Sequence, residues 1–186
     1  MLNNGNVRAD GTFTGGGADL AEYFPLAPSA SVAPGQVVGL SGGRVSLATR
    51  DAEQVAVVSS DPAFVGNPDA EAGGALVALV GQVEVEVGGP AEAGDLLVAS
   101  GREDGTARAV ALADYAPGAD GPVLGRILRL TEAGRVVALV GVDEASALRA
   151  VVATQAARLD AQQAQIDALA RRLDALTASG PTAAAH

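Results

Sequence analysis

A five-residue sequence, Val-Ala-Leu-Val-Gly, occurs at residues 77–81 and again sixty positions later at residues 137–141. Before each copy the chain runs through similar segments: a hairpin that turns at glycine, and then another apolar strand. A unit of three or four strands does not cover its own apolar face, so the two units are expected to pack or close on each other. The repeat therefore predicts a mainly β fold. In it, duplicated β-hairpin/strand units at about residues 34–81 and 93–141 form a small barrel or sandwich.

Two further segments predict local features of this β domain. Residues 82–87 alternate valine with Gln or Glu, so the valines are expected in the core and the glutamates on a solvated face. The loop at residues 61–74 is rich in Pro and Gly but also contains Phe64 and Val65. We expect these two apolar side chains to pin the loop to the core.

After the second repeat, the apolar residues change to alternating steps of four and three. This heptad pattern predicts a coiled-coil oligomerisation helix over residues 143–179. Its seam consists of Leu148, Val152, Gln155, Leu159, Gln162, Ile166, Leu169, Leu173 and Leu176. The alternative is an amphipathic helix docked on its own β domain, which normally has a wider apolar stripe. The narrow seam therefore favours self-association, as a homotrimer or a dimer.

Composition excludes several kinds of site. The chain has no cysteine and no lysine, and its one histidine, His186, is the last residue. Thiolate chemistry, histidine-based triads and Cys or His metal sites therefore lack their residues, and neither a metal nor a cofactor is expected. Twenty-two acidic residues against twelve arginines give a net charge of −10, which argues against nucleic acid as a partner.

The sequence also lacks the usual membrane signals. No apolar run approaches the roughly 20 residues of a spanning helix. The first residues lack the charged and apolar regions of a signal peptide. We therefore expect no membrane partner, and synthesis in the cytoplasm without a signal peptide.

The candidate catalytic residues lie at residues 15–25, where three glycines lead into Asp19 and Glu22. The spacing alone favours a structural reading, in which Asp19 caps a helix and Glu22 occupies the N3 position. In the catalytic reading, one carboxyl is kept protonated by its neighbour's charge and the other activates water or a hydroxyl. Thr14 is the hydroxyl residue beside the glycines, so Thr14–Gly15 is the candidate scissile bond.

Several segments together resemble a known family. They are Gly17-Ala18-Asp19-Leu20-Ala21-Glu22-Tyr23-Phe24, the hairpin at residues 37–47, Val57-Val58-Ser59, and Pro62-Ala63-Phe64-Val65-Gly66-Asn67. They resemble the C-terminal autoprocessing domain of phage pre-neck-appendage and tail-spike proteins, a glutamic-type self-cleaving peptidase also described as an intramolecular chaperone. The resemblance covers about residues 15–142. It implies a trimeric β domain that helps a fibre to assemble and then cuts itself off just before the Gly-Ala-Asp run, with the family's acids at Asp19 and Glu22.

The chain departs from the family pattern at the cut. Thr14 and three glycines stand where a serine is expected, and fourteen residues precede Gly15. A cut at this point of the chain is therefore expected to release only a short segment. The other phage self-cleaving class uses a serine–lysine dyad, which a chain without lysine does not supply.

These observations predict both the organisation and the function of the chain. The expected parts are a strand pair ending a fibre-like region at 1–14, a β domain at 15–142, a coiled coil at 143–179 and a disordered tail at 180–186. The favoured function is a structural trimerisation or assembly-chaperone cap of a phage-type tail fibre or spike-like appendage, in a virion or phage-tail-like particle. Its partners are then copies of itself and an upstream fibre or particle component. The alternatives are a self-cleaving endopeptidase that cuts near Thr14–Gly15, and a receptor- or glycan-binding fibre tip.

Overall fold

The computed structural model describes residues 16–68, 73–116, 119–131, 134–141 and 144–178. The strand pair predicted at residues 1–14, the candidate bond Thr14–Gly15 and the tail predicted at 180–186 lie outside these residues. The chain divides into two compact units, residues 1–147 and residues 148–186. Each unit is described by itself.

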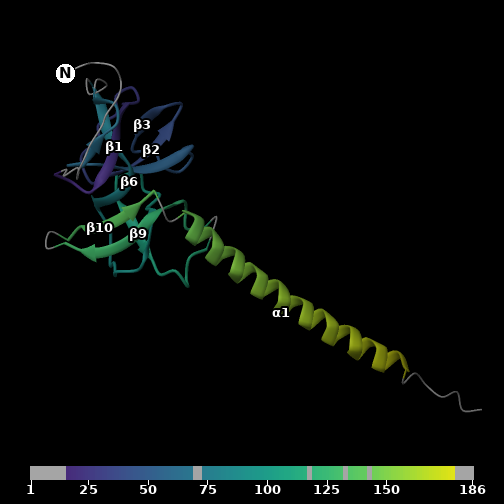
Figure 1. Cartoon of the computed structure of the whole chain (residues 1–186). Helices are drawn as coiled ribbons and strands as arrows, with labels where there is room; N and C mark the ends of the chain where they lie inside the picture. Colours follow the sequence, from purple (N-terminus) through teal and green to yellow (C-terminus); the bar gives the residue numbers. More distant parts are fainter. Residues whose placement is uncertain (1–15, 69–72, 117–118, 132–133, 142–143, 179–186) are drawn as a thin grey trace, which may run out of the picture. The chain divides into compact units, whose positions relative to one another are not determined.

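The described residues form ten β-strands and one helix (Figure 1). The strands are β1 (Asp19–Pro25), β2 (Val37–Ser41), β3 (Arg44–Ser46), β4 (Gln54–Val58), β5 (Phe64–Val65), β6 (Gly74–Val85), β7 (Leu96–Ala99), β8 (Ala107–Val110), β9 (Val123–Leu130) and β10 (Val136–Val140). The helix is α1 (Glu144–Ala178). The prediction of a mainly β fold followed by a C-terminal helix is confirmed.

Eight of the strands follow one path, in the order β3-β2-β4-β6-β10-β9-β7-β8. From the centre outwards, this path runs β6, β4, β2, β3 on one side and β10, β9, β7, β8 on the other. These are the strands of the two sequence copies in matching order, so the duplication is confirmed as two half-sheets joined between β6 and β10. Figure 1 shows β2 and β3 in the upper part of the β domain and β9 and β10 in the lower part. Together the strands form a curled, largely antiparallel half-barrel.

Strand β6 changes its pairing partners along its length and joins the two half-sheets. Its first half pairs with β1 and β4, and its second half pairs with β10. The change of partner falls at Gly81, the last residue of the first repeat motif, where φ is +126°. The matching residue of the second motif, Gly141, has a φ of +77°. Both positions therefore use a backbone conformation that glycine adopts more readily than other residues.

The core is made of small and medium aliphatic side chains. Its largest fully buried members are Leu96, Leu97 and Ile127, and the rest are mainly valine. In the second half of β6, Val83 and Val85 are buried while Glu84 is exposed, which confirms the predicted alternation for these residues, whereas Glu86 and Val87 beyond the strand are both half-buried. Period-two alternation of this kind places one face of a strand on the core and the other in water.

The loop residue Phe64 does not behave as predicted. It is 61% exposed, so it does not pin the loop to the core. The loop is instead tied to β1 through its backbone, because β5 (Phe64–Val65) pairs in parallel with Leu20 and Ala21. Backbone hydrogen bonds therefore hold the loop in place, where the sequence had predicted a buried apolar side chain.

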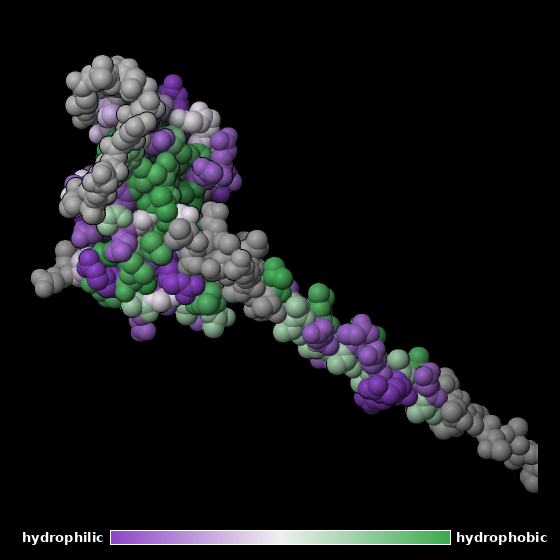
Figure 2. Space-filling model, viewed as in Figure 1, coloured by the Kyte–Doolittle hydropathy of each residue, from purple (hydrophilic) through white to green (hydrophobic). Residues whose placement is uncertain are grey.

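Helix α1 contains all nine residues of the predicted seam, and its 35 residues span roughly 50 Å. Those apolar seam residues whose side chains are described, namely Val152, Leu159, Ile166, Leu169 and Leu173, are 58–64% exposed. Figure 2 shows hydrophobic residues recurring between hydrophilic ones along this helix. A coiled coil requires a second helix, so the coiled coil stays a prediction. No helix among the described residues is both long and apolar enough to span a membrane.

Candidate functional site

Asp19 and Glu22 lie in strand β1, and the helix-cap reading of this segment is wrong. β1 pairs with β6 along one edge and with β5 along the other. These two ladders satisfy the backbone groups of the segment more completely than one short helical turn would. In a strand, residues three apart point to opposite faces of the sheet. The structure therefore does not bring the two predicted acids together.

The carboxyl group of Asp19 is buried. Asp19 is 5% exposed and Ser59 is 3% exposed, and within the described part of the chain neither the Asp19 Oδ2 atom nor the Ser59 hydroxyl makes a hydrogen bond of good geometry. Burial raises the pKa of Asp19, and the negative charge of Asp61 acts in the same direction. The Ser59 hydroxyl and the backbone of Asp19 itself partly oppose this rise in the pKa. Asp19 is thus an acid that holds its proton more strongly than an exposed carboxyl does.

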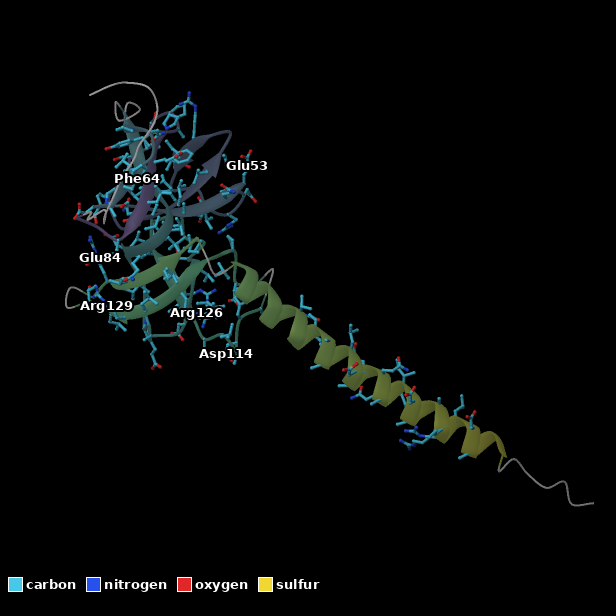
Figure 3. The ribbon with its side chains drawn as sticks, viewed as in Figure 1. Glu53, Phe64, Glu84, Asp114, Arg126 and Arg129 are labelled. Carbon is cyan, nitrogen blue, oxygen red and sulfur yellow. The ribbon has the colours of Figure 1, made fainter. Side chains whose placement is uncertain are left out.

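Asp19 and Ser59 line a hollow of about 340 Å³ at the surface of the β domain. Its other lining residues are Ala18, Ser60, Asp61, Gln82, Val83, Glu84, Arg129 and Val137. Figure 3 shows Glu84 and Arg129 at the same edge of the domain. The hollow therefore combines a buried carboxyl and a buried hydroxyl with charged groups of both signs at its rim.

Glycines bring the start of β1 close to Asp61. A Cβ on Gly17 would collide with the backbone of Asp61 and Pro62, so only glycine fits there. A Cβ on Gly16 would lie 3.7 Å from both carboxylate oxygens of Asp61. The chain that leads into Asp19 thus passes directly beside the Asp61 carboxylate.

Backbone hydrogen bonds hold the loop that carries Ser59 and Asp61 against β1. The Ala63 amide donates to the Asp19 carbonyl at 2.8 Å, and the Ser59 amide donates to the Leu76 carbonyl at 2.8 Å. Ser59 is therefore fixed to β6 while the end of the loop is fixed to β1. This places Asp61 between two anchored points.

Glu22 lies in different surroundings, beside Gly66. A Cβ on Gly66 would come within 2.9 Å of the Glu22 Cγ atom, so the missing side chain makes room for Glu22. Next to it, the Tyr23 amide donates to Asn67 Oδ1 at 2.7 Å, and Asn67 Nδ2 donates to the Tyr23 carbonyl at 3.0 Å. The Val-Gly-Asn segment that carries part of the family resemblance thus has a structural role, since it secures the loop to β1.

Ser59 and Asp61 also line this site, and neither was predicted from the sequence. Both lie in or beside segments that carry the family resemblance, but their distance of about forty residues from Asp19 concealed the contact. The pairing of β1 with β5 and β6 brings them to Asp19. In the described part of the chain, no group of three or more His, Cys, Asp or Glu residues is arranged to hold a metal ion.

Comparison with known families identifies a matching family model. Residues 2–73 match the family model Peptidase_G2, the IMC autoproteolytic cleavage domain. Asp19, Glu22, Ser59 and Asp61 all fall in the matched segment. The resemblance to a self-cleaving family is therefore confirmed. A search of curated proteins gave no match.

Among solved structures, the chain is similar to bacteriophage phi29 gene product 12. Its pre-mature form is 21% identical with a TM-score of 0.52, over 74% of this chain and 23% of that protein. The C-terminal fragment of the same phage protein is 19% identical with a TM-score of 0.46, over 66% of this chain and 98% of the fragment. The first of these similarities supports a shared fold. The chain spans about a quarter of the length of the pre-mature phage protein.

Proposed function

We propose that this chain is the self-cleaving assembly domain of a phage-type appendage. The observation that carries the proposal is the buried Asp19 carboxyl beside a glycine segment, within the residues that match an autoproteolytic cleavage family. The similarity to a phage protein supports the biological setting, a virion or phage-tail-like particle. The substrate is the chain itself, with Thr14–Gly15 as the candidate bond.

The chemistry follows from the state of Asp19. A carboxyl whose pKa is raised by burial retains a proton at a higher pH and can give it to the nitrogen that leaves when a peptide bond is cut. The bond is part of the same chain, so its cleavage has the high effective concentration of an intramolecular reaction. One turnover per molecule is enough, and this tolerates a slow reaction.

Cleavage of a fusion protein tests this proposal. A stable reporter domain joined before Met1 provides an upstream partner, and intact mass spectrometry measures the products. We expect two fragments from the wild type and only full-length protein from Asp19→Asn. Asp51→Asn, at an exposed loop position, is the matched control and should cleave like the wild type. Full-length wild-type protein, or equal cleavage by Asp19→Asn, would contradict the proposal.

We also propose that α1 holds several copies of the chain together, most simply as a homotrimer that caps the appendage. The supporting observation is a narrow row of five apolar side chains that are 58–64% exposed along the helix. Gln155 and Gln162 share the row. Such residues suit a layer in which identical side chains from several helices hydrogen-bond one another. Copies of the same helix are therefore the best-matched partner.

Sedimentation equilibrium of the full chain tests this second proposal. The expected mass is three times that of the 18.3 kDa chain at micromolar concentration. A dimer would retain self-association through α1 but change the symmetry of the cap. A monomer would contradict the proposal.

A further inference from the structure

A second hollow of the β domain lies where the two sequence copies meet. Its volume is about 350 Å³, and none of its described lining residues belongs to the hollow of Asp19. The first copy contributes Thr49 and Arg50, and the second contributes residues 99–101, Arg108 and residues 119–122. Small-molecule sites have volumes of roughly 300–1,000 Å³, so this hollow has room for one small ligand.

Two arginine side chains line the hollow, and hydrogen bonds hold both of them. Arg50 Nη2 donates to the Gly101 carbonyl at 3.0 Å, and among the described residues Arg50 forms no ion pair. Arg108 Nη2 donates to the Asp120 carboxylate at 2.7 Å. A guanidinium has five N–H donors, so each arginine keeps donors for a further acceptor. Arginine binds a carboxylate well because two of these donors can bond it at once.

The one carboxylate of the hollow is already engaged by the protein. Asp120 Oδ1 accepts from Arg108, and Asp120 Oδ2 accepts from the Ala116 amide at 2.6 Å. Two arginines and one aspartate give the lining a charge of +1, in a chain whose formal net charge is −10. The hollow is therefore a locally positive site, which favours an anionic ligand.

The rest of the lining suits the hydroxyl groups of a ligand. Thr49, which is 5% exposed, and Ser100 contribute hydroxyl groups, and Gly101 and Gly121 contribute peptide groups. The described lining contains no aromatic side chain on which a flat ring would stack. The matching ligand therefore carries one anionic group and several hydroxyl groups, which is the chemistry of a sugar acid.

We propose that this hollow binds an acidic monosaccharide unit. Its carboxylate pairs with Arg50 and Arg108, and its hydroxyl groups bond Thr49, Ser100 and the neighbouring peptide groups. This binding function is separate from self-cleavage and does not depend on it. It gives the appendage domain a means of attachment to an acidic polysaccharide.

Amide chemical shifts of the ¹⁵N-labelled full chain test the proposal. Glucuronate is the probe, and all titrations are made at matched ionic strength. Glucose lacks the carboxylate, and inorganic phosphate lacks the sugar ring with its hydroxyl groups. We expect saturable shifts of the Gly101 and Gly121 amides with glucuronate, and binding at least tenfold weaker for both glucose and phosphate.

Arg50→Gln tests the role of the arginine that has no ion pair. Loss of a charge-assisted hydrogen bond should weaken glucuronate binding by about tenfold or more. Arg44→Gln is the matched control, because Arg44 is also exposed and its Nη1 donates to the Leu26 carbonyl at 3.0 Å outside the hollow. Both variants change the net charge equally, so only Arg50→Gln should affect binding. Circular dichroism checks that each variant is folded.

Ala119→Glu tests the site without removing either arginine. Ala119 is exposed and lines the hollow, so a glutamate there should repel the ligand carboxylate and weaken binding by at least tenfold. Ala116→Glu, at an exposed position outside the lining, should bind like the wild type. This pair decides the matter if Arg50→Gln does not fold.

Three results would overturn the proposal. The first is the absence of saturable shifts with glucuronate. The second is equally tight binding of glucose or phosphate, which would mean that the hollow does not select a sugar acid. The third is binding within about twofold of the wild type in folded Arg50→Gln or in Ala119→Glu.

Discussion

Gly81 of β6 lies directly opposite Asp19 of β1, and a Cβ on Gly81 would come within 2.6 Å of the Asp19 Cα atom. The glycine that ends the first repeat motif therefore also leaves the space that the candidate acid, Asp19, occupies in the sheet. Gly141, its counterpart, is equally close to β6, since a Cβ there would lie 2.9 Å from the Val80 Cα atom. Glycine occupies both repeated positions for the same physical reason, which is close contact between backbones at a positive φ.

Gly81→Ala should destabilise the β domain. The added methyl group would meet the backbone of Ala18 and Asp19, and alanine is strained at a φ of +126°. Steric overpacking and backbone strain each cost about 1–3 kcal/mol. Urea unfolding of the full chain measures the loss.

Gly89→Ala is the matched control for this substitution. Its φ of +134° is similar, but no atom of the described residues, apart from its two chain neighbours, lies within 4 Å of the added methyl group. The loss of unfolding free energy in Gly81→Ala should therefore exceed that in Gly89→Ala. Equal losses would mean that backbone strain alone accounts for the effect and that the contact with Asp19 is unimportant.

The unfolding free energy of Asp19→Asn, relative to that of the wild type, should increase as the pH rises. Burial raises the pKa of Asp19 in the folded protein above its ordinary value of 3.8, so the folded state binds the proton more tightly than the unfolded state does. The wild type therefore loses stability as the pH rises from 3.8 through the folded pKa, and the asparagine variant does not. Unfolding free energies of both proteins between pH 3 and pH 8 test this, and a constant difference would contradict it.

Asp120→Asn should show the opposite pH dependence. The Ala116 amide and the Arg108 guanidinium hold the pKa of Asp120 below 3.8, through hydrogen bonds of 2.6 and 2.7 Å. The carboxylate thus contributes stability above pH 3.8, and this contribution is lost as the pH falls through the folded pKa. The substitution should lower the free energy of unfolding by about 1 kcal/mol at pH 7, and this loss should shrink below pH 3.8. Urea unfolding at pH 7 and below pH 3.8 measures the loss, and a loss that grows on acidification would contradict the prediction.

Ile166→Asp should break the association of α1 helices. Ile166 is in the apolar row and is 58% exposed in the single chain, so a charge there would be buried only when copies associate. Ala164→Asp, off the row on the same helix, is the matched control. Sedimentation velocity should show a shift to monomer for Ile166→Asp alone. The same shift in both variants would indicate loss of helix rather than loss of a seam.

The duplicated fold could be predicted because its signal is local and repeated. Two copies of Val-Ala-Leu-Val-Gly, each after a glycine hairpin, specify matching strands, and the matching order of the two half-sheets follows from them. The helix could be predicted for the same reason, since a period of three and four residues needs no distant contact. Phe64 was wrongly placed in the core because composition does not reveal that a loop is held by its backbone.

The sequence by itself determined the strand and helix content, the duplication, and the absence of cysteine, lysine and internal histidine chemistry. Only the tertiary structure decided which acids meet. Asp19 and Glu22 are neighbours in the chain, but the alternation of a strand turns them to opposite faces. Asp61 is forty-two residues from Asp19, yet the pairing of β1 with β5 and β6 brings its loop to the same hollow. Contacts of this kind depend on strand register, which is set by the packing of the whole sheet.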